Sequence, residues 1–325
     1  MNIAIVGLRH GHIFSIYDMV KVSDEFSVIG AFEEDEEARN SAINNGFNCN
    51  YNSLEEVLND KSVDIVALGG CYADRGKVAI KALKAGKHVI ADKPLCTSLE
   101  ELDEIENLAK NNNLFVSCLF TMRFEKKIIA LKKLVESGAL GEINNVYFGG
   151  QHPLMYGRRP MWYFEEGKHG GVINDIAIHG IDILNYALGL KVENICCARE
   201  WNKFAKKATQ FKDSAQFMLV ANNGAGIIAD VSYAVPDGIE FDLPYYWQFT
   251  VWGTKGTIRF SLYEKESYYY IDGERSPILL EEGDITTDFL TDFSNMIKGK
   301  DNIILNMEAV IEATRKTLEI QINAC

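Results

Sequence analysis

Short apolar runs alternate with amphipathic stretches from Met1 to about Leu119. The runs read NIAIVG, FSVIGAF, VDIVALGG, KHVIAD and LFVSCLF, and a helix-like stretch separates each from the next. Strands that alternate with helices form a parallel sheet with right-handed crossovers. Because the runs are almost continuously apolar, we expect both faces of this sheet to be covered. The pattern predicts an α/β, doubly wound nucleotide-binding fold.

The pattern changes after a predicted helix at 126–137, which Gly138 ends. Longer strand-like runs follow at 145–149, 215–221, 225–233, 247–252 and 256–262. The turn Asn222-Asn223-Gly224 is a hairpin signal, and one further helix is predicted near 172–188. The chain is therefore expected to hold a Rossmann dinucleotide-binding domain at 1–121. Residues 122–325 are expected to form an α+β domain, for substrate binding and oligomerisation, with a large, mostly antiparallel sheet.

Composition narrows the class of protein. The chain has 325 residues, 47% of them hydrophobic and 24% charged, which is typical of a folded soluble protein. No apolar run reaches the roughly 18 to 20 residues that span a bilayer. A net charge of −13 without a basic patch argues against nucleic acid as a partner. Seven cysteines without a CxxC pair favour a reducing cytoplasm over a disulfide framework or a zinc ribbon.

A glycine-containing loop follows the first predicted strand and leads into a helix. Such a loop is where the diphosphate of a dinucleotide meets backbone N–H groups. The loop is irregular, because a GxGxxG motif would have glycine at Arg9 and His12. We interpret five of its residues as cofactor-binding: Gly7, Arg9, His10, Gly11 and His12. The HxH spacing also suits a metal, but no nearby acid or thiolate completes a site, so no metal is predicted.

An acid ends the second predicted strand. Glu33 lies in the range where a carboxylate commonly binds the ribose 2′-hydroxyl, and it would repel a 2′-phosphate. NAD is therefore favoured over NADP. The alternative is that Glu33 and the four acidic residues after it only form the solvated, acidic first turn of a helix.

Two further segments carry ionisable groups. Lys93 follows the fourth predicted strand, at the sheet edge where ligands of open α/β sheets bind, and a charge there could favour a developing alkoxide. Asp175 and His179 are four residues apart on a largely apolar helix, so they share one face. An aspartate can orient a histidine and raise its basicity, leaving it able to take a hydroxyl proton. A buried pair without a catalytic role is the alternative.

With these features together, the chain resembles the glucose-fructose oxidoreductase, inositol dehydrogenase and rhizopine catabolism (Gfo/Idh/MocA) family along essentially its whole length. The matching segments are AGKHVIADKP at 85–94, SGALGEI at 137–143, GGVINDIAIHGIDIL at 170–184 and GTKGTI at 253–258. The resemblance implies that Lys93 contacts substrate and cofactor, that His179 is the acid/base group, and that Asp175 assists it or binds a hydroxyl. It also implies an oligomer, a homodimer or homotetramer, that forms through the C-terminal sheet.

The resemblance adds further site residues and two departures. Gly70 and Asp92 fall among the cofactor-binding positions, and Arg123 and Trp162 among the substrate-pocket positions. Arg75 stands where many members have a histidine near the cofactor, and this departure from the family pattern joins that of the irregular glycine loop. Asp182 also matches a family position, and we interpret it as structural.

The predicted function is NAD(P)-dependent hydride transfer between the nicotinamide and a CH–OH or carbonyl carbon of a sugar, cyclic polyol or sugar acid. The altered loops leave open a dinucleotide-binding sensor without turnover. A second enzyme class, cleavage of a carbon–halogen or ether bond through an oxidised intermediate, stays open by analogy of fold alone.

Overall fold

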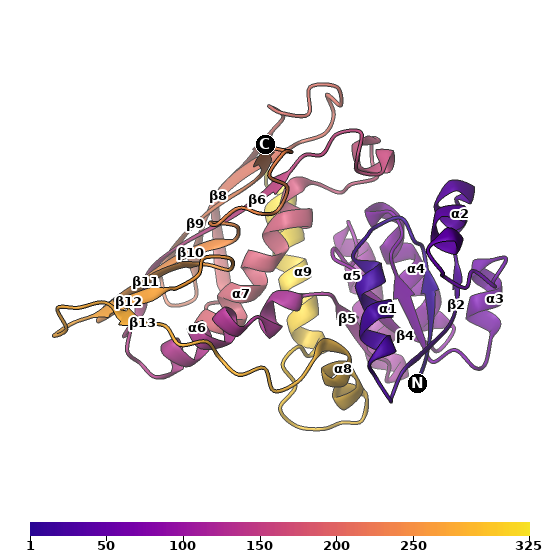
Figure 1. The fold of residues 1–325 in the computed structure, drawn as a ribbon, viewed down its shortest axis with the longest axis horizontal. Helices are drawn as coiled ribbons and strands as arrows, with labels where there is room; N and C mark the ends of the chain where they lie inside the picture. Colours follow the sequence, from indigo (N-terminus) through magenta and orange to yellow (C-terminus); the bar gives the residue numbers. More distant parts are fainter. The chain divides into compact units, whose positions relative to one another are not determined.

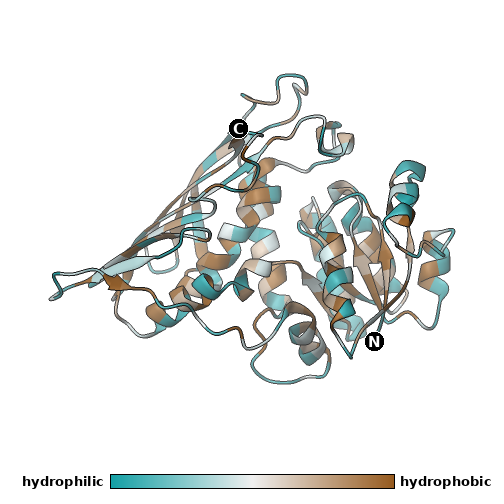
Figure 2. Ribbon diagram, viewed as in Figure 1, coloured by the Kyte–Doolittle hydropathy of each residue, from teal (hydrophilic) through white to brown (hydrophobic).

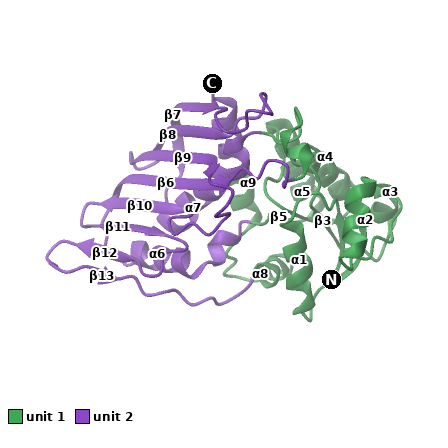
Figure 3. Cartoon of the chain, turned by 45° about the horizontal axis from the view of Figure 1, so that its top comes forward, with its two compact units in different colours: residues 1–119, 160–170, 289–315 green, residues 120–159, 171–288, 316–325 purple.

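The computed structural model describes residues 1–325, which divide into two units (Figure 3). Unit 1 consists of residues 1–119, 160–170 and 289–315. Unit 2 consists of residues 120–159, 171–288 and 316–325. Two segments distant from the N-terminal region in sequence therefore belong to unit 1, which the hydrophobic pattern did not predict. No helix is both long and apolar enough for a membrane span.

A five-stranded parallel sheet forms the centre of unit 1, in the order β2-β1-β3-β4-β5. Its strands are β1 (Asn2–Val6), β2 (Ser27–Phe32), β3 (Ile65–Leu68), β4 (His88–Ala91) and β5 (Val116–Cys118). The four residues of β3 are all buried, and Figure 2 shows the sheet as mostly hydrophobic. The predicted doubly wound parallel sheet is confirmed.

Helices connect these strands and flank the sheet (Figure 1). They are α1 (Ile13–Lys21), α2 (Glu36–Asn44), α3 (Leu54–Asn59), α4 (Tyr72–Lys84) and α5 (Leu99–Asn112), with α8 (Phe289–Ile297) added from the C-terminal part. Three of them begin at a side-chain cap: Asp35, Ser53 and Ser98 accept the N–H group three residues on. Each cap satisfies one backbone N–H group in the first turn of its helix.

An eight-stranded sheet forms unit 2, in the order β13-β12-β11-β10-β6-β9-β8-β7. Its strands are β6 (Ile143–Pro153), β7 (Val192–Trp201), β8 (Ser214–Ala221), β9 (Gly226–Val235), β10 (Gln248–Gly253), β11 (Gly256–Ser261), β12 (Tyr268–Ile271) and β13 (Ile278–Leu279). Only β6 and β9 pair in parallel, so the predicted mostly antiparallel sheet is confirmed. The hairpin predicted at 222–224 joins β8 to β9.

Two helices of unit 2, α6 (Lys126–Glu136) and α7 (Ile178–Leu188), pack together, and α7 contacts β6. The contact is close because residue 180 is a glycine: a Cβ there would lie 2.2 Å from the Phe148 ring. A short π-helical segment, Ile173–Ala177, comes directly before α7, where the sequence had predicted one continuous helix. The helix α9 (Met307–Ile322) ends the chain, and its last residues belong to unit 2.

Candidate functional site

A cavity of about 300 Å³ opens at the carboxyl ends of β1, β2 and β3 in unit 1. This is the edge of a doubly wound sheet where nucleotides bind. The lining includes predicted cofactor-binding residues, namely Gly7, Arg9, Glu33, Gly70 and Arg75. It also includes Asn52, Ser53 and Asp74, which no local motif had marked. The fold therefore gathers half of the ten predicted cofactor residues around one cavity. The other five, which are not among its lining residues, are His10, Gly11, His12, Asp92 and Lys93.

The glycine loop approaches the loop after β3 closely. Gly7 has φ +82°, and a Cβ on it would lie 2.4 Å from the backbone nitrogen of Gly70. The N–H groups of Arg9 and His10 both donate to the carbonyl oxygen of Gly69, at 3.1 and 3.0 Å. Glycine at position 7 is thus required by the contact between two loops, and these two amides are engaged within unit 1.

The carboxylate of Glu33 is buried and held by backbone donors. The N–H of Leu8 donates to Oε2 at 2.5 Å, and that of Asp35 donates to Oε1 at 2.9 Å. Burial raises the pKa of Glu33, while these two hydrogen bonds and the Arg9 charge oppose the rise. Arg9 Nη1 lies 3.9 Å from Glu33 and 3.5 Å from Asp35. An acid anchored in this way keeps lone pairs that can accept a ribose hydroxyl.

Asp92, fully buried directly after β4, is surrounded by an arginine and two histidines. Its Oδ2 accepts from Arg75 Nη2 at 2.9 Å and lies against Nδ1 of His10, while Nδ1 of His12 is 3.4 Å from Oδ1. Burial alone would raise the pKa of Asp92, but the charges of His10 and Arg75 hold it well below its usual range. Burial lowers the pKa of His10 to about 4, against the attraction of Asp92. The sequence analysis found no acid near the HxH motif, but the structure places Asp92 beside both histidines.

Arg75 and the segment 160–170 enclose this cluster. Arg75 also donates to the carbonyl oxygens of Gly70 and Asp92, at 3.0 and 2.8 Å, so it fixes the loop that carries Lys93. Lys93 is 3% exposed, with Nζ 5.9 Å from the centre of the Tyr72 ring. Trp162, predicted as a substrate residue, is buried and donates from Nε1 to the carbonyl oxygen of Arg9 at 3.2 Å.

Hydrogen-bonded tyrosines that the sequence analysis did not identify complete the cluster. The hydroxyl of Tyr163 lies 2.7 Å from Nε2 of His10 and 2.5 Å from the hydroxyl of Tyr72, which is itself 3.1 Å from that nitrogen. These contacts join positions separated by 62 to 153 residues in the chain. No local spacing could have revealed them, because they arise only when α4 and segment 160–170 fold against the glycine loop.

In unit 2, Asp175 and His179 stand at the junction of the π-helical segment and α7. Asp175 is 2% exposed and its Oδ2 accepts a hydrogen bond from the hydroxyl of Tyr233 on β9. His179 is 8% exposed, and its ring packs against Trp247 with centroids 5.7 Å apart. The side chain of Gln321 caps the segment by accepting from the N–H groups of Ile173 and Asn174 at 3.1 and 3.3 Å. Such π turns are frequent at functional sites.

Arg123, predicted as a substrate residue, forms a buried ion pair with Asp182 of α7. Its Nη2 donates to Oδ1 at 2.6 Å and its Nε to Oδ2 at 2.9 Å, while its guanidinium stacks 4.6 Å from the Tyr186 ring. Burial raises the pKa of Asp182, and the Arg123 charge opposes that rise. The pair fixes α7 to the 3-10 turn Thr121–Phe124 that carries Arg123.

Both parts of the chain match one family. Residues 1–120 match an oxidoreductase family described by its NAD-binding Rossmann fold, and residues 128–259 match the GFO/IDH/MocA C-terminal domain. The chain is similar to myo-inositol 2-dehydrogenase of Thermotoga maritima, with 27% identity over 60% of this chain and 57% of that protein. It is also similar to D-xylose dehydrogenase of Paenarthrobacter nicotinovorans, with 24% identity over 70% of this chain and 62% of that protein. The chain thus spans less than two thirds of these relatives.

A solved structure shares the fold over the whole chain. Aldose-aldose oxidoreductase from Caulobacter crescentus, complexed with glycerol, superposes with a TM-score of 0.80 over 100% of this chain and 97% of that one. The sequence identity is 18%, so this likeness shows the fold alone.

Proposed function

Because the chain belongs to the Gfo/Idh/MocA oxidoreductase family, we propose that it is an NAD-dependent dehydrogenase. Its substrate would be a CH–OH group of a sugar, cyclic polyol or sugar acid. The observation that carries the proposal is the cavity at the carboxyl ends of β1, β2 and β3, with a buried acid at the end of β2. The names of the relatives, which include inositol and xylose dehydrogenases, support the substrate class.

The cavity suits the adenosine half of a dinucleotide. Gly70 lines it, and a Cβ built on that residue would meet no atom within 4 Å, so the backbone faces open space. The buried Glu33 carboxylate would accept a ribose hydroxyl. A 2′-phosphate would instead meet Glu33 and Asp35, whose charges already engage the nearby Arg9. This arrangement favours NAD over NADP.

Residues of each unit have a proposed part in the chemistry. NAD, when bound, supplies the hydride acceptor. In unit 2, His179 would take the proton from the substrate hydroxyl oxygen as the hydride leaves the carbon that carries this hydroxyl. The buried Asp175, held by Tyr233, would assist it. In unit 1, the ammonium group of Lys93 would stabilise negative charge that develops on the substrate oxygen. Water is kept from Lys93 by its burial, which strengthens that interaction.

A second copy of the chain would cover the outer face of the unit 2 sheet. Cross-strand register aligns Met218, Ile228 and Tyr147 in one row, and Met218 and Ile228 are 43% and 55% exposed. An apolar row of this kind on a long sheet is typical of an interface. The measurement is molar mass in solution for the wild-type chain and for Ile228→Lys, which should dissociate. The seven free cysteines suit a reducing compartment such as the cytoplasm.

The first experiment is a titration with NADH and NADPH, followed by a screen of polyols and sugars for NAD-dependent turnover. We expect tighter binding of NADH. His179→Ala should lower turnover by about 10²- to 10⁴-fold while cofactor affinity stays within twofold. Unchanged turnover would remove His179 from the chemistry. Cofactor binding without turnover of any alcohol would instead support the sensor that the irregular loops leave open.

A further inference from the structure

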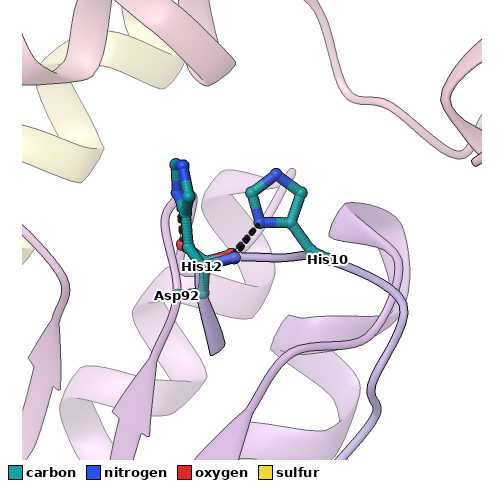
Figure 4. Close-up of side chains that lie close together, drawn as sticks. All are labelled: His10, His12 and Asp92. Atoms are coloured by element: carbon teal, nitrogen blue, oxygen red, sulfur yellow. Dashed lines mark hydrogen bonds and ion pairs between the residues drawn. The ribbon is translucent and has the colours of Figure 1, made fainter. Parts of the chain in front are cut away.

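Two histidines of the glycine loop and the aspartate after β4 gather in unit 1 (Figure 4). One ligand atom from each of His10, His12 and Asp92 lies within 4.8 Å of the other two. We propose that these three side chains bind one divalent transition-metal ion of the zinc type. None of the three is Lys93, Asp175 or His179, and the proposal does not depend on the proposed dehydrogenase function.

An unsatisfied carboxylate oxygen points to a cation. Asp92 is fully buried, and its two oxygens have different surroundings. Arg75 donates to Oδ2, but Oδ1 accepts no hydrogen bond and has the imidazole of His12 beside it. A buried polar atom without a partner carries a desolvation penalty, and such atoms are rare in native proteins. A bound cation would supply the missing partner.

The spacing of one ligand pair agrees with tetrahedral coordination. Zinc binds imidazole nitrogen and carboxylate oxygen at about 2.0–2.1 Å, so two ligand atoms in a tetrahedral site lie roughly 3.4 Å apart. Nδ1 of His12 is 3.4 Å from Oδ1 of Asp92. Nδ1 of His10 contacts the same carboxylate. A metal bound by both groups would take the place of that contact, and the His10 ring would move away from the carboxylate to make room for it.

Groups around the ligands are arranged to orient them. Metal-binding histidines usually donate their second ring N–H to a neighbouring acceptor, and metal-binding carboxylates are themselves hydrogen-bonded. Nε2 of His10 lies 2.7 Å from the Tyr163 hydroxyl. With the proton assigned to Nε2, the Nδ1 lone pair faces the site. Arg75 holds the other oxygen of Asp92, which leaves Oδ1 for the ion.

Access and ligand type set the choice of ion. The His12 side chain is 58% exposed, so the site opens to solvent on that side and water can complete the coordination. Two imidazoles and one carboxylate favour Zn²⁺, Co²⁺ or Ni²⁺ over Mg²⁺ or Ca²⁺, which prefer oxygen ligands alone. We therefore expect a three-residue site with one open position.

The test is calorimetric titration of the full chain, without a histidine tag and after treatment with a chelator, with Zn²⁺ alone. One equivalent should bind. His12→Ala and His12→Gln should each weaken binding at least tenfold, with far-UV circular dichroism unchanged because His12 is exposed. The matched control replaces the exposed Cys196 and Cys197 with serine, and Zn²⁺ affinity should stay within twofold.

Co²⁺ provides a second readout that does not depend on activity. Its visible spectrum should show nitrogen and oxygen ligands without a thiolate-to-cobalt band, and an excess of Mg²⁺ should leave the spectrum unchanged. The proposal is overturned if no equivalent binds or if both His12 variants bind Zn²⁺ as tightly as the wild-type chain. Loss of binding in the cysteine variant, or displacement of Co²⁺ by Mg²⁺, would also overturn it.

Discussion

Two buried aspartates, one in each unit, face an arginine, and they differ in how completely they are paired. In unit 2, Asp182 receives hydrogen bonds from Nε and Nη2 of Arg123, and both of its oxygens are engaged. In unit 1, Asp92 receives only one bond from Arg75, at Oδ2, and its Oδ1 lies 3.4 Å from Nδ1 of His12 without a hydrogen bond. We call Asp182 the closed aspartate, because both of its oxygens accept hydrogen bonds. We call Asp92 the open aspartate, because its Oδ1 accepts none and can bind another group.

The difference distinguishes a buried carboxylate that stabilises the fold from one that is available to bind a ligand. A carboxylate surrounded by a planar arginine fork is fully satisfied, so the Arg123–Asp182 pair explains the position of α7 without any ligand. A carboxylate that shares one oxygen with several titratable groups is a less favourable arrangement for stability alone. Such clusters are typical of binding and catalytic sites. Asp92 also adjoins Lys93 in the chain, so its surroundings position a proposed catalytic group.

The largest effect is expected when the closed pair is broken. Arg123→Leu leaves the Asp182 carboxylate, whose side chain is 1% exposed, without its counter-charge. Breaking a buried pair from one side costs about 3–5 kcal/mol. The free energy of unfolding, measured by urea denaturation of the full chain, should fall by that amount. Such a loss would also lower activity indirectly, without any role for Arg123 in the pocket.

The double variant Arg123→Leu/Asp182→Leu is the control for this experiment. Apolar residues in place of both partners should recover most of the loss, because the uncompensated charge is gone. If Arg123→Leu alone unfolds within 1 kcal/mol of the wild-type chain, the pair is not closed as described and the contrast with Asp92 fails.

A smaller effect is expected from pH. Burial raises the pKa of Asp182, and Arg123 opposes the rise, so removal of Arg123 should raise the pKa further. A raised pKa means that the folded protein takes up the proton first as the pH falls, which stabilises it relative to the unfolded chain. The penalty of Arg123→Leu should therefore be greatest at neutral pH and shrink towards pH 5. Urea midpoints measured at both pH values for the two proteins test this, and a constant difference would contradict it.

The sequence predicted the two sheets better than it predicted which side chains surround the buried aspartates. The apolar runs predicted both sheets, because buried strands have a characteristic pattern of apolar residues over a few neighbouring positions. Glu33 and Lys93 could be proposed as site residues because each follows a strand, and strand ends share one edge of a parallel sheet. The partnership of His10 with Asp92 spans 82 positions, and no periodicity links groups that distant. The π-helical segment before α7 was missed because a helical pattern does not distinguish four-residue from five-residue hydrogen bonding.

The smallest effect on stability is expected at the open side of Asp92. The His12 side chain is 58% exposed, and its Nδ1 lies 3.4 Å from Oδ1 of Asp92. Because the folded chain buries little of this side chain, its removal should cost the folded state little stability. His12→Ala should therefore change the free energy of unfolding by at most about 0.5 kcal/mol, as for other exposed positions, when measured in a chelator. With Zn²⁺ present, the wild-type chain should gain stability from ligand binding and the variant should gain much less. A loss above about 2 kcal/mol in the chelator would mean that His12 holds the loop together as Arg123 holds α7, and the distinction between an open and a closed aspartate would no longer stand.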